Sequence, residues 1–168
     1  LLATPGVIDL ADAEAVVAKL TLGGWTSWPA DEQAAVLTFL MEWWRNVLVS
    51  DPNETPAEPV LCAIGLAESD LSKYLSAWDD LLTASESAAL QLANLVNHEI
   101  HLAKPNLKLS NAFWDKSSPQ ANQVLHWLIR PEVRAAVERA FFVAQGDEAR
   151  ELSWAVQNLG GLAARSSE

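Results

Sequence analysis

The chain has 168 residues, of which half are hydrophobic and eight are tryptophan, and its net charge is −11. A chain of this length buries enough surface to form a core of its own. We therefore expect residues 1–168 to form a single helical domain. This domain could be a fragment of a longer chain, because the sequence begins at Leu1 and its one methionine is Met41. The single cysteine, Cys62, excludes an internal disulfide and any multi-cysteine metal site.

The negative charge is unevenly placed along the chain. Residues 1–99 hold 15 acidic and 3 basic side chains, whereas residues 100–168 hold 7 acidic and 8 basic. Binding to a nucleic-acid backbone requires the opposite sign, so the expected partners are proteins, with a basic one electrically favoured. The simpler interpretation is that the acidity keeps a tryptophan-rich protein soluble. No apolar run is long enough to cross a bilayer and no signal peptide is recognisable, so we expect no membrane partner. The one cysteine, Cys62, lies in an apolar run and fits a reducing, cytoplasmic location.

The first predicted helix covers residues 9–20 and ends at Gly23-Gly24. The next, over residues 29–49, is the longest and most regularly patterned helix of the chain. Its apolar residues form two adjacent ridges, one containing Phe39 and Trp43 and the other containing Trp44. Because these ridges cover more than half of the circumference, we expect neighbours on two sides and a central position for this helix.

Further helices are predicted over 56–67, 70–82, 84–102, 119–129 and 131–145, and a last one runs from Asp147 to Gly160-Gly161. Capping boxes are expected at 55–58 and 83–86, where a threonine is followed three residues later by a glutamate. The stretch 103–117 has no helical period, and loops of that length inside a domain are usually functional or mobile. No segment alternates with period two for long enough to predict a strand.

About eight helices with short connections indicate an all-α fold. The pattern Val36-Leu37-x-Phe39-Leu40 recurs as Val124-Leu125-x-Trp127-Leu128, each time on a helix opened by proline. In helix length and pairing the chain over roughly residues 29–160 resembles a divergent HEAT or armadillo helical array. That resemblance implies stacked antiparallel helical hairpins in an α-α superhelix, but the period of about 40–47 residues of such arrays is not kept. An irregular helical bundle is the alternative.

The most pointed chemical feature is a polar arc on the helix predicted over 84–102. It combines amides and imidazoles, and its members are Gln91, Asn94, Asn97, His98 and His101. Imidazoles three residues apart project from one helix face, so His98 and His101 are weak candidates for a shared metal ion. A zinc site would need a third ligand, and His98-Glu99-Ile100-His101 is one residue shorter than the zincin pattern H-E-x-x-H. The alternative is an ordinary polar face that lines a groove.

Glu99 lies on the apolar centre line of the same helix, between Leu92, Leu95 and Val96. If it were buried, its carboxyl pKa would rise and it could act as a general acid or base. Its place near the predicted helix end also allows it to reach water. The sequence contains no G-x-S-x-G motif and no phosphate-binding glycine loop, so no complete catalytic set is predicted.

Besides Trp44, which lies in an apolar ridge of the helix predicted over 29–49, the other seven tryptophans divide into two groups. Those on or near predicted inner helix faces, Trp43, Trp78, Trp127 and Trp154, are expected to pack in the core. Those in connections are Trp25, Trp28 and Trp114. Exposed aromatics in connections would suit a protein contact, although covering the ends of helices is an alternative role.

We therefore expect a non-catalytic protein–protein interaction module, one version of which is an acidic inhibitor or immunity-type protein for a basic partner. The expected binding residues are Gln91, Asn94, His98, His101, Trp114 and Trp28. No cofactor is expected. The alternative is a metal-binding bundle or hydrolase that uses His98, His101 and Glu99. A third possibility is a structural domain of a longer protein.

Overall fold

The computed structural model describes residues 17–101, 108–111, 114 and 119–165. Residues 17–22 are helical, and a short 3-10 helix, η1 (Trp25–Ser27), follows. The remaining elements are α2 (Ala30–Leu48), α3 (Ala57–Ala67), α4 (Ser72–Leu82), α5 (Glu86–His98), β1 (Ile100–His101), β2 (Lys108–Leu109), α6 (Pro119–Leu128), α7 (Pro131–Val143) and α8 (Gly146–Arg165). The all-α prediction is confirmed, because each of the two strands is only two residues long.

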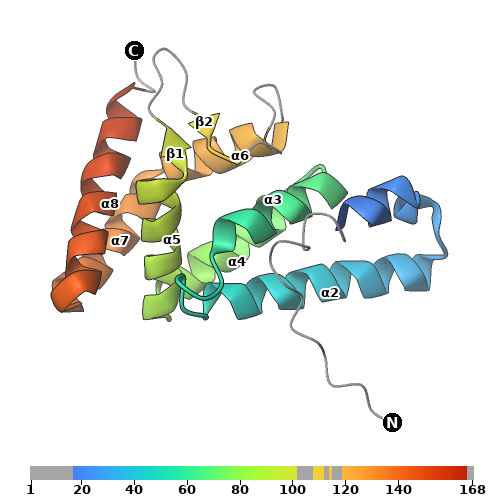
Figure 1. Ribbon diagram of the computed structural model, residues 1–168, viewed down its shortest axis with the longest axis horizontal. Coiled ribbons are helices and arrows are strands. Elements are labelled where there is room, and N and C mark those ends of the chain that lie inside the picture. The colour runs from blue at the N-terminus through green and yellow to red at the C-terminus, as the bar shows by residue number, and fades with distance from the viewer. Residues whose placement is uncertain (1–16, 102–107, 112–113, 115–118, 166–168) are drawn as a thin grey trace, which may run out of the picture.

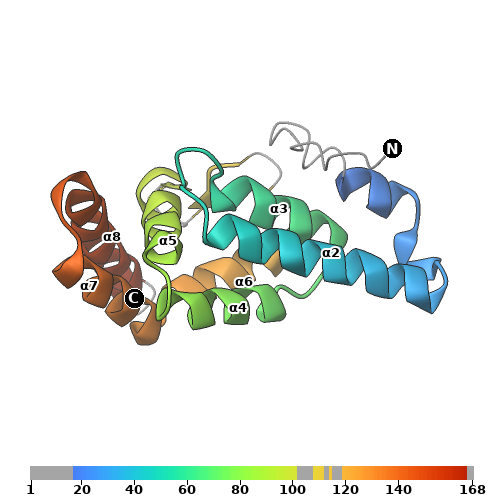
Figure 2. The same cartoon turned by 90° about the horizontal axis from the view of Figure 1, so that it is seen from below.

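The helix at the centre of the molecule is α5. It contacts α2, α3 and α4 on one side and α7 and α8 on the other. Both views show it between these two groups of helices (Figures 1 and 2). The sequence of α5 explains this position, since small and branched apolar residues are buried around most of its circumference: Ala88, Ala89, Leu92, Ala93, Leu95 and Val96. Alanines let neighbouring helices approach closely, and the leucines fill the spaces between them.

The predicted central position of α2 is therefore wrong. Trp44 is fully buried, but Trp43 is only partly buried and Phe39 is 49% exposed. The C-terminal half of α2 packs into the molecule, whereas its N-terminal half extends away from α5 (Figure 2). Helix α2 does have neighbours, since α3, α4 and α5 all contact it, but it lies within one of the two groups of helices and not between them.

Three tryptophans form a continuous cluster in the core. Trp44 meets Trp78 edge to face, with ring centroids 5.2 Å apart, and Trp78 stacks on Trp127 at 5.0 Å. Each indole N–H has an acceptor: Trp44 donates to the carbonyl of Tyr74, Trp78 to that of Ala88, and Trp127 to a carboxylate oxygen of Asp79. We refer to Trp44, Trp78 and Trp127 as the tryptophan cluster. It joins α2, α4 and α6, which explains why these helices pack together.

The core prediction for Trp154 is wrong, because this side chain is 47% exposed. The buried stripe of α8 is Leu152, Ala155, Leu159 and Leu162. Two residues along a helix turn the side chain by about 200°, so Trp154 points away from the stripe that begins at Leu152.

Two helix ends differ from the prediction. Helix α5 ends at His98 because the carbonyl of Glu99 accepts a hydrogen bond from the Ser110 amide (2.8 Å), which begins the antiparallel β1–β2 pairing of Ile100 with Leu109. Helix α8 continues through Gly160-Gly161 to Arg165. The guanidinium of Arg134 on α7 lies in the space that a side chain at Gly160 would need. Tertiary packing therefore overrides the local stop signal.

Within the described ranges, no helix combines the length and apolarity that crossing a membrane requires.

Candidate functional site

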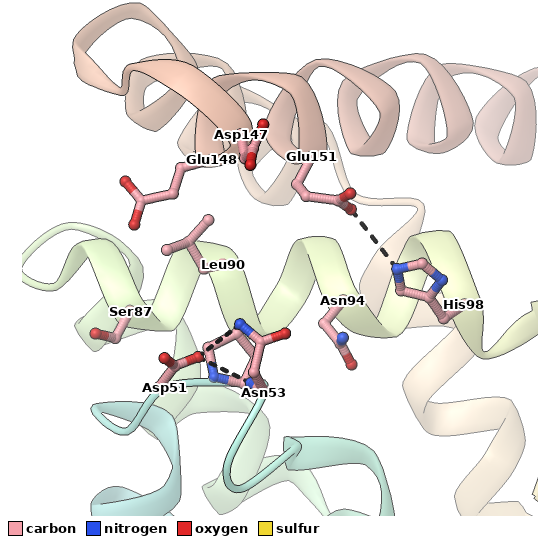
Figure 3. A pocket seen from close by; sticks show the side chains of 10 residues that line it. Asp51, Asn53, Ser87, Leu90, Asn94, His98, Asp147, Glu148 and Glu151 are labelled. Atoms are coloured by element: carbon pink, nitrogen blue, oxygen red, sulfur yellow. Dashed lines mark hydrogen bonds and ion pairs between the residues drawn. The ribbon is translucent and has the colours of Figure 1, made fainter.

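A groove of about 460 Å³ lies where the α2–α3 connection, α5 and the start of α8 meet (Figure 3). Its lining comprises Asp51, Pro52 and Asn53 from the connection, Ser87, Leu90, Asn94 and His98 from α5, and Asp147, Glu148 and Glu151 from α8. We call it the acidic groove, because four of these residues are carboxylates and none is lysine or arginine.

Each wall follows from local sequence. Ser87, Leu90, Asn94 and His98 are spaced by three or four residues, so they share one face of α5 and form the floor. Asp147 and Glu148 occupy the first turn of α8, where the helix dipole favours negative charge, and Glu151 follows one turn later. On the opposite wall Asp51 is held in a tight turn, because its carboxylate accepts hydrogen bonds from both the amide N–H (2.8 Å) and the side-chain amide (2.9 Å) of Asn53.

The carboxylates are only partly neutralised by neighbours. Arg150 pairs with Asp147, and His98 Nε2 lies 3.6 Å from Oε2 of Glu151, with the imidazole 54% exposed. The same Glu151 oxygen accepts a hydrogen bond from Asn97 Nδ2 at 3.0 Å. Glu148 makes no ion pair with any other described residue. The groove therefore presents concentrated negative charge, which attracts cations and excludes anions.

The predicted polar arc is divided by the structure. Asn94 and His98 line the acidic groove, as a groove-lining face would. Asn97 instead fastens α5 to α8: its side chain donates to the carbonyl and the carboxylate of Glu151 and accepts a hydrogen bond from Asn158 (3.0 Å). The polar face was thus visible in the sequence, but part of it is used for helix packing.

Gln91 lies outside the groove and is fully buried. Its side-chain oxygen accepts a hydrogen bond from the Ala57 amide at 2.8 Å, which caps the first turn of α3. Its amide nitrogen lies within hydrogen-bonding distance of three carbonyl oxygens, those of Val47 (3.1 Å), Ser50 (3.1 Å) and Thr55 (2.8 Å). The capping box expected at 55–58 is therefore wrong, because α3 has no N-cap side-chain bond and a distant glutamine takes that role.

The two tryptophans predicted as binding residues have structural partners. Trp114 is 9% exposed, packs on Gly65 and donates its indole N–H to a carboxylate oxygen of buried Glu58 at 2.7 Å. Trp28 is half-buried and donates to the carbonyl of Gly23 at 3.0 Å. Neither lines the acidic groove. The Trp28 contact matches the alternative role, in which such indoles cover helix ends, whereas Trp114 lies along the side of α3, where it contacts Glu58 and Gly65.

The residues of the metal alternative are placed as follows. Glu99 is partly buried, and Oγ of Ser110 donates to its carboxylate. His98 faces Glu151 across the groove. The backbone of His101 lies in β1, but its side chain is outside the described part of the chain. Among the described residues no three histidine, cysteine, aspartate or glutamate side chains form a group that could hold a metal ion.

The sequence reasoning missed Asp51, Asp147, Glu148 and Glu151 as site residues. Asp147 appears in the sequence analysis only as the start of the last predicted helix, and the acidity of the chain is assigned there mainly to residues 1–99, yet three of the four groove carboxylates lie beyond residue 99. The available signal was the dense group Asp147, Glu148, Glu151, but nothing local indicates that Asp51 lies opposite it.

Comparison with models of known protein families, with curated proteins and with solved structures gave no match. The resemblance to HEAT or armadillo arrays therefore stays a prediction, and any function must be argued from the acidic groove itself.

Proposed function

We propose that this protein is a non-catalytic interaction module and that its acidic groove receives a lysine- or arginine-rich segment of a protein partner. The observation that carries this proposal is the charge of the groove, whose lining has four carboxylates and no lysine or arginine. An acidic inhibitor or immunity-type protein that neutralises a basic partner is the version that best fits this chemistry. Nucleic acid is disfavoured, because its phosphates carry the same sign as the groove.

The apolar part of the lining supports a side chain rather than a small inorganic cation. Leu90 lies on the floor (Figure 3), and Pro52 of the connection also lines the groove, so both add apolar surface to the acidic lining. Lysine and arginine have an aliphatic stem and a charged end, so the stem can pack on this surface while the end meets Asp51 or Glu148. Asn94 can add a neutral hydrogen bond from the floor.

Cytoplasmic location belongs to the same proposal. It rests on Cys62, which is buried and is the chain's one cysteine. A chain that relies on core packing instead of disulfides suits a reducing compartment.

The test is binding of a fluorescent peptide rich in arginine and lysine, measured by anisotropy at low and at high salt. We expect binding that weakens as salt rises, because exposed charges are screened. Asp147→Asn/Glu148→Gln should weaken it about threefold to tenfold, since a contact between exposed charges is worth no more than about 1 kcal/mol. An acidic peptide of the same length should not bind.

A matched control removes the same charge elsewhere. Asp31 and Glu32 also lie in a helix first turn, that of α2, and neither lines the groove. Asp31→Asn/Glu32→Gln therefore changes the net charge and the helix-dipole interaction in the same way. If this control weakens peptide binding as much as the groove variant does, the attraction is a property of the whole surface and the proposed site is wrong.

A further inference from the structure

The groove wall that carries Asp51 belongs to a connection without secondary structure of its own. This connection joins α2 to α3, over residues 49–56, and contributes Asp51, Pro52 and Asn53 to the lining. Such a segment keeps a defined position only if its backbone polar groups have fixed partners.

The backbone of the connection makes turns of its own, in which the Asp51 carbonyl accepts hydrogen bonds from the amides of Glu54 and Thr55, and a side chain of the floor helix ties this connection to α5. The side-chain oxygen of Gln91 accepts a hydrogen bond from the Ala57 amide in the first turn of α3, and its amide nitrogen lies within hydrogen-bonding distance of the carbonyls of Val47, Ser50 and Thr55. The Val47 carbonyl and the Ala57 amide are groups that a helix C-terminus and a helix N-terminus leave without intrahelical partners, whereas the Ser50 and Thr55 carbonyls belong to the connection itself. Groups at both ends of the connection thus contact the side-chain amide of one buried residue, Gln91.

The floor of the groove is built from the same stretch of α5. Ser87, Leu90 and Asn94 lie within one turn of Gln91 along the helix. Helix α5 therefore contains the floor residues and, through the contacts of Gln91, also holds the connection that forms the Asp51 wall. A change in the contacts of this amide would therefore be felt on the wall that carries Asp51 and lies opposite the carboxylates of α8.

We propose that Gln91 is the positioning residue of the acidic groove, which holds the Asp51 wall at the separation needed by a basic side chain without touching that side chain. This inference rests on the proposed function of the groove. It differs from a merely structural role because it predicts a loss of peptide affinity and a local change in hydrogen exchange at the groove wall, which the loss of a bridging amide at another connection does not cause.

The chain offers a matched control in Gln123. This residue on α6 accepts a hydrogen bond from the Leu71 amide at 2.7 Å and donates to the carbonyl of Ser69 at 2.9 Å, so it also closes a connection, the one between α3 and α4. It does not line the acidic groove. Gln91→Met and Gln123→Met each replace a bridging amide by an apolar side chain of similar length.

The experiment measures peptide affinity and amide hydrogen exchange in both variants, at a temperature at which circular dichroism shows each to be folded. We expect Gln91→Met to weaken binding of the arginine- and lysine-rich peptide about tenfold or more, whereas Gln123→Met changes it less than about twofold. Exchange should accelerate at the amides of Asn53, Thr55 and Ala57 in Gln91→Met alone.

Two results would overturn the inference: unchanged exchange at residues 53–57 in Gln91→Met, or equal loss of peptide affinity in both variants. Should wild-type protein fail to bind the peptide, the proposed function is refuted, and the exchange measurement still decides whether Gln91 holds the wall. If Gln91→Met does not fold, Gln91→His, which retains a donor and an acceptor, replaces it in the same comparison.

Discussion

The tryptophan cluster yields the sharpest prediction for stability, through the substitution Trp78→Phe. Trp78 is fully buried, lies between Trp44 and Trp127, and donates its indole N–H to the Ala88 carbonyl at 3.0 Å. Phenylalanine keeps an aromatic ring in place but removes the second ring and the donor. The change therefore tests packing and hydrogen bonding at the point where α2, α4 and α6 meet.

The expected loss can be worked from three contributions. The missing ring leaves a cavity of about 40 Å³, which costs about 1 kcal/mol at roughly 24 cal/mol per Å³. The lost burial of its atoms contributes about 1 kcal/mol, and the lost hydrogen bond about 1 kcal/mol more. We therefore expect the free energy of unfolding to fall by about 3 kcal/mol, a large part of the roughly 5–15 kcal/mol typical of a domain.

The measurement is urea unfolding followed by far-UV circular dichroism, which does not depend on tryptophan fluorescence. The same substitution at the half-exposed Trp154 serves as control and should change the free energy by no more than about 0.5 kcal/mol. If Trp78→Phe and Trp154→Phe destabilise equally, the cluster does not make the contribution assigned to it.

The remaining predictions concern glycines in helices and the single tyrosine. Gly161→Ala should stabilise the fold by about 0.5–1 kcal/mol, since the added Cβ meets no atom within 4 Å. Gly65→Ala should not stabilise it, because the added Cβ would lie 3.1 Å from the Trp114 ring. Thermal melting compares the two, and equal gains would contradict the close packing of Trp114. Burial, with Glu68 adding to it, raises the pKa of Tyr74 above its ordinary value of 10.0. The folded state therefore retains the proton while the unfolded state loses it, so stability should decline as the pH rises above 10.0. Tyr74→Phe should reduce this decline in stability. Because the chain has one tyrosine, tyrosinate absorbance during an alkaline titration reports on Tyr74 alone. Ionisation of Tyr74 near pH 10.0 with the helices intact would refute the assignment.

Much of the secondary structure was predictable because its signals are local. The helix predicted over 119–129 begins at Pro119 as expected, and that over 131–145 begins at Pro131, since proline favours the first helical turn. The predicted ends were less accurate where distant groups competed. Ser110 draws the backbone of Glu99 out of α5, and Arg134 packs over Gly160 so that α8 continues.

The candidate site was predictable only in part. Asn94 and His98 were recognised because amides and imidazoles at helical spacing define a polar face. Gln91 was noticed for the same reason, but its partners lie 34–44 residues away in sequence, so its role as a bridge was not predictable. The periodicity of α2 was correct, yet periodicity reports how much of a helix is apolar and not which neighbours are present.

By itself the sequence determined an acidic, all-α chain and most of its helix boundaries, because helical periodicity, proline positions and charge are properties of neighbouring residues. Only the tertiary structure decided that α5 is central and that Asp51 faces Asp147, Glu148 and Glu151 across one groove. The physical reason is that helices with apolar faces can pack in many arrangements of similar burial. Long-range contacts such as those of Gln91 and the tryptophan cluster select one of them.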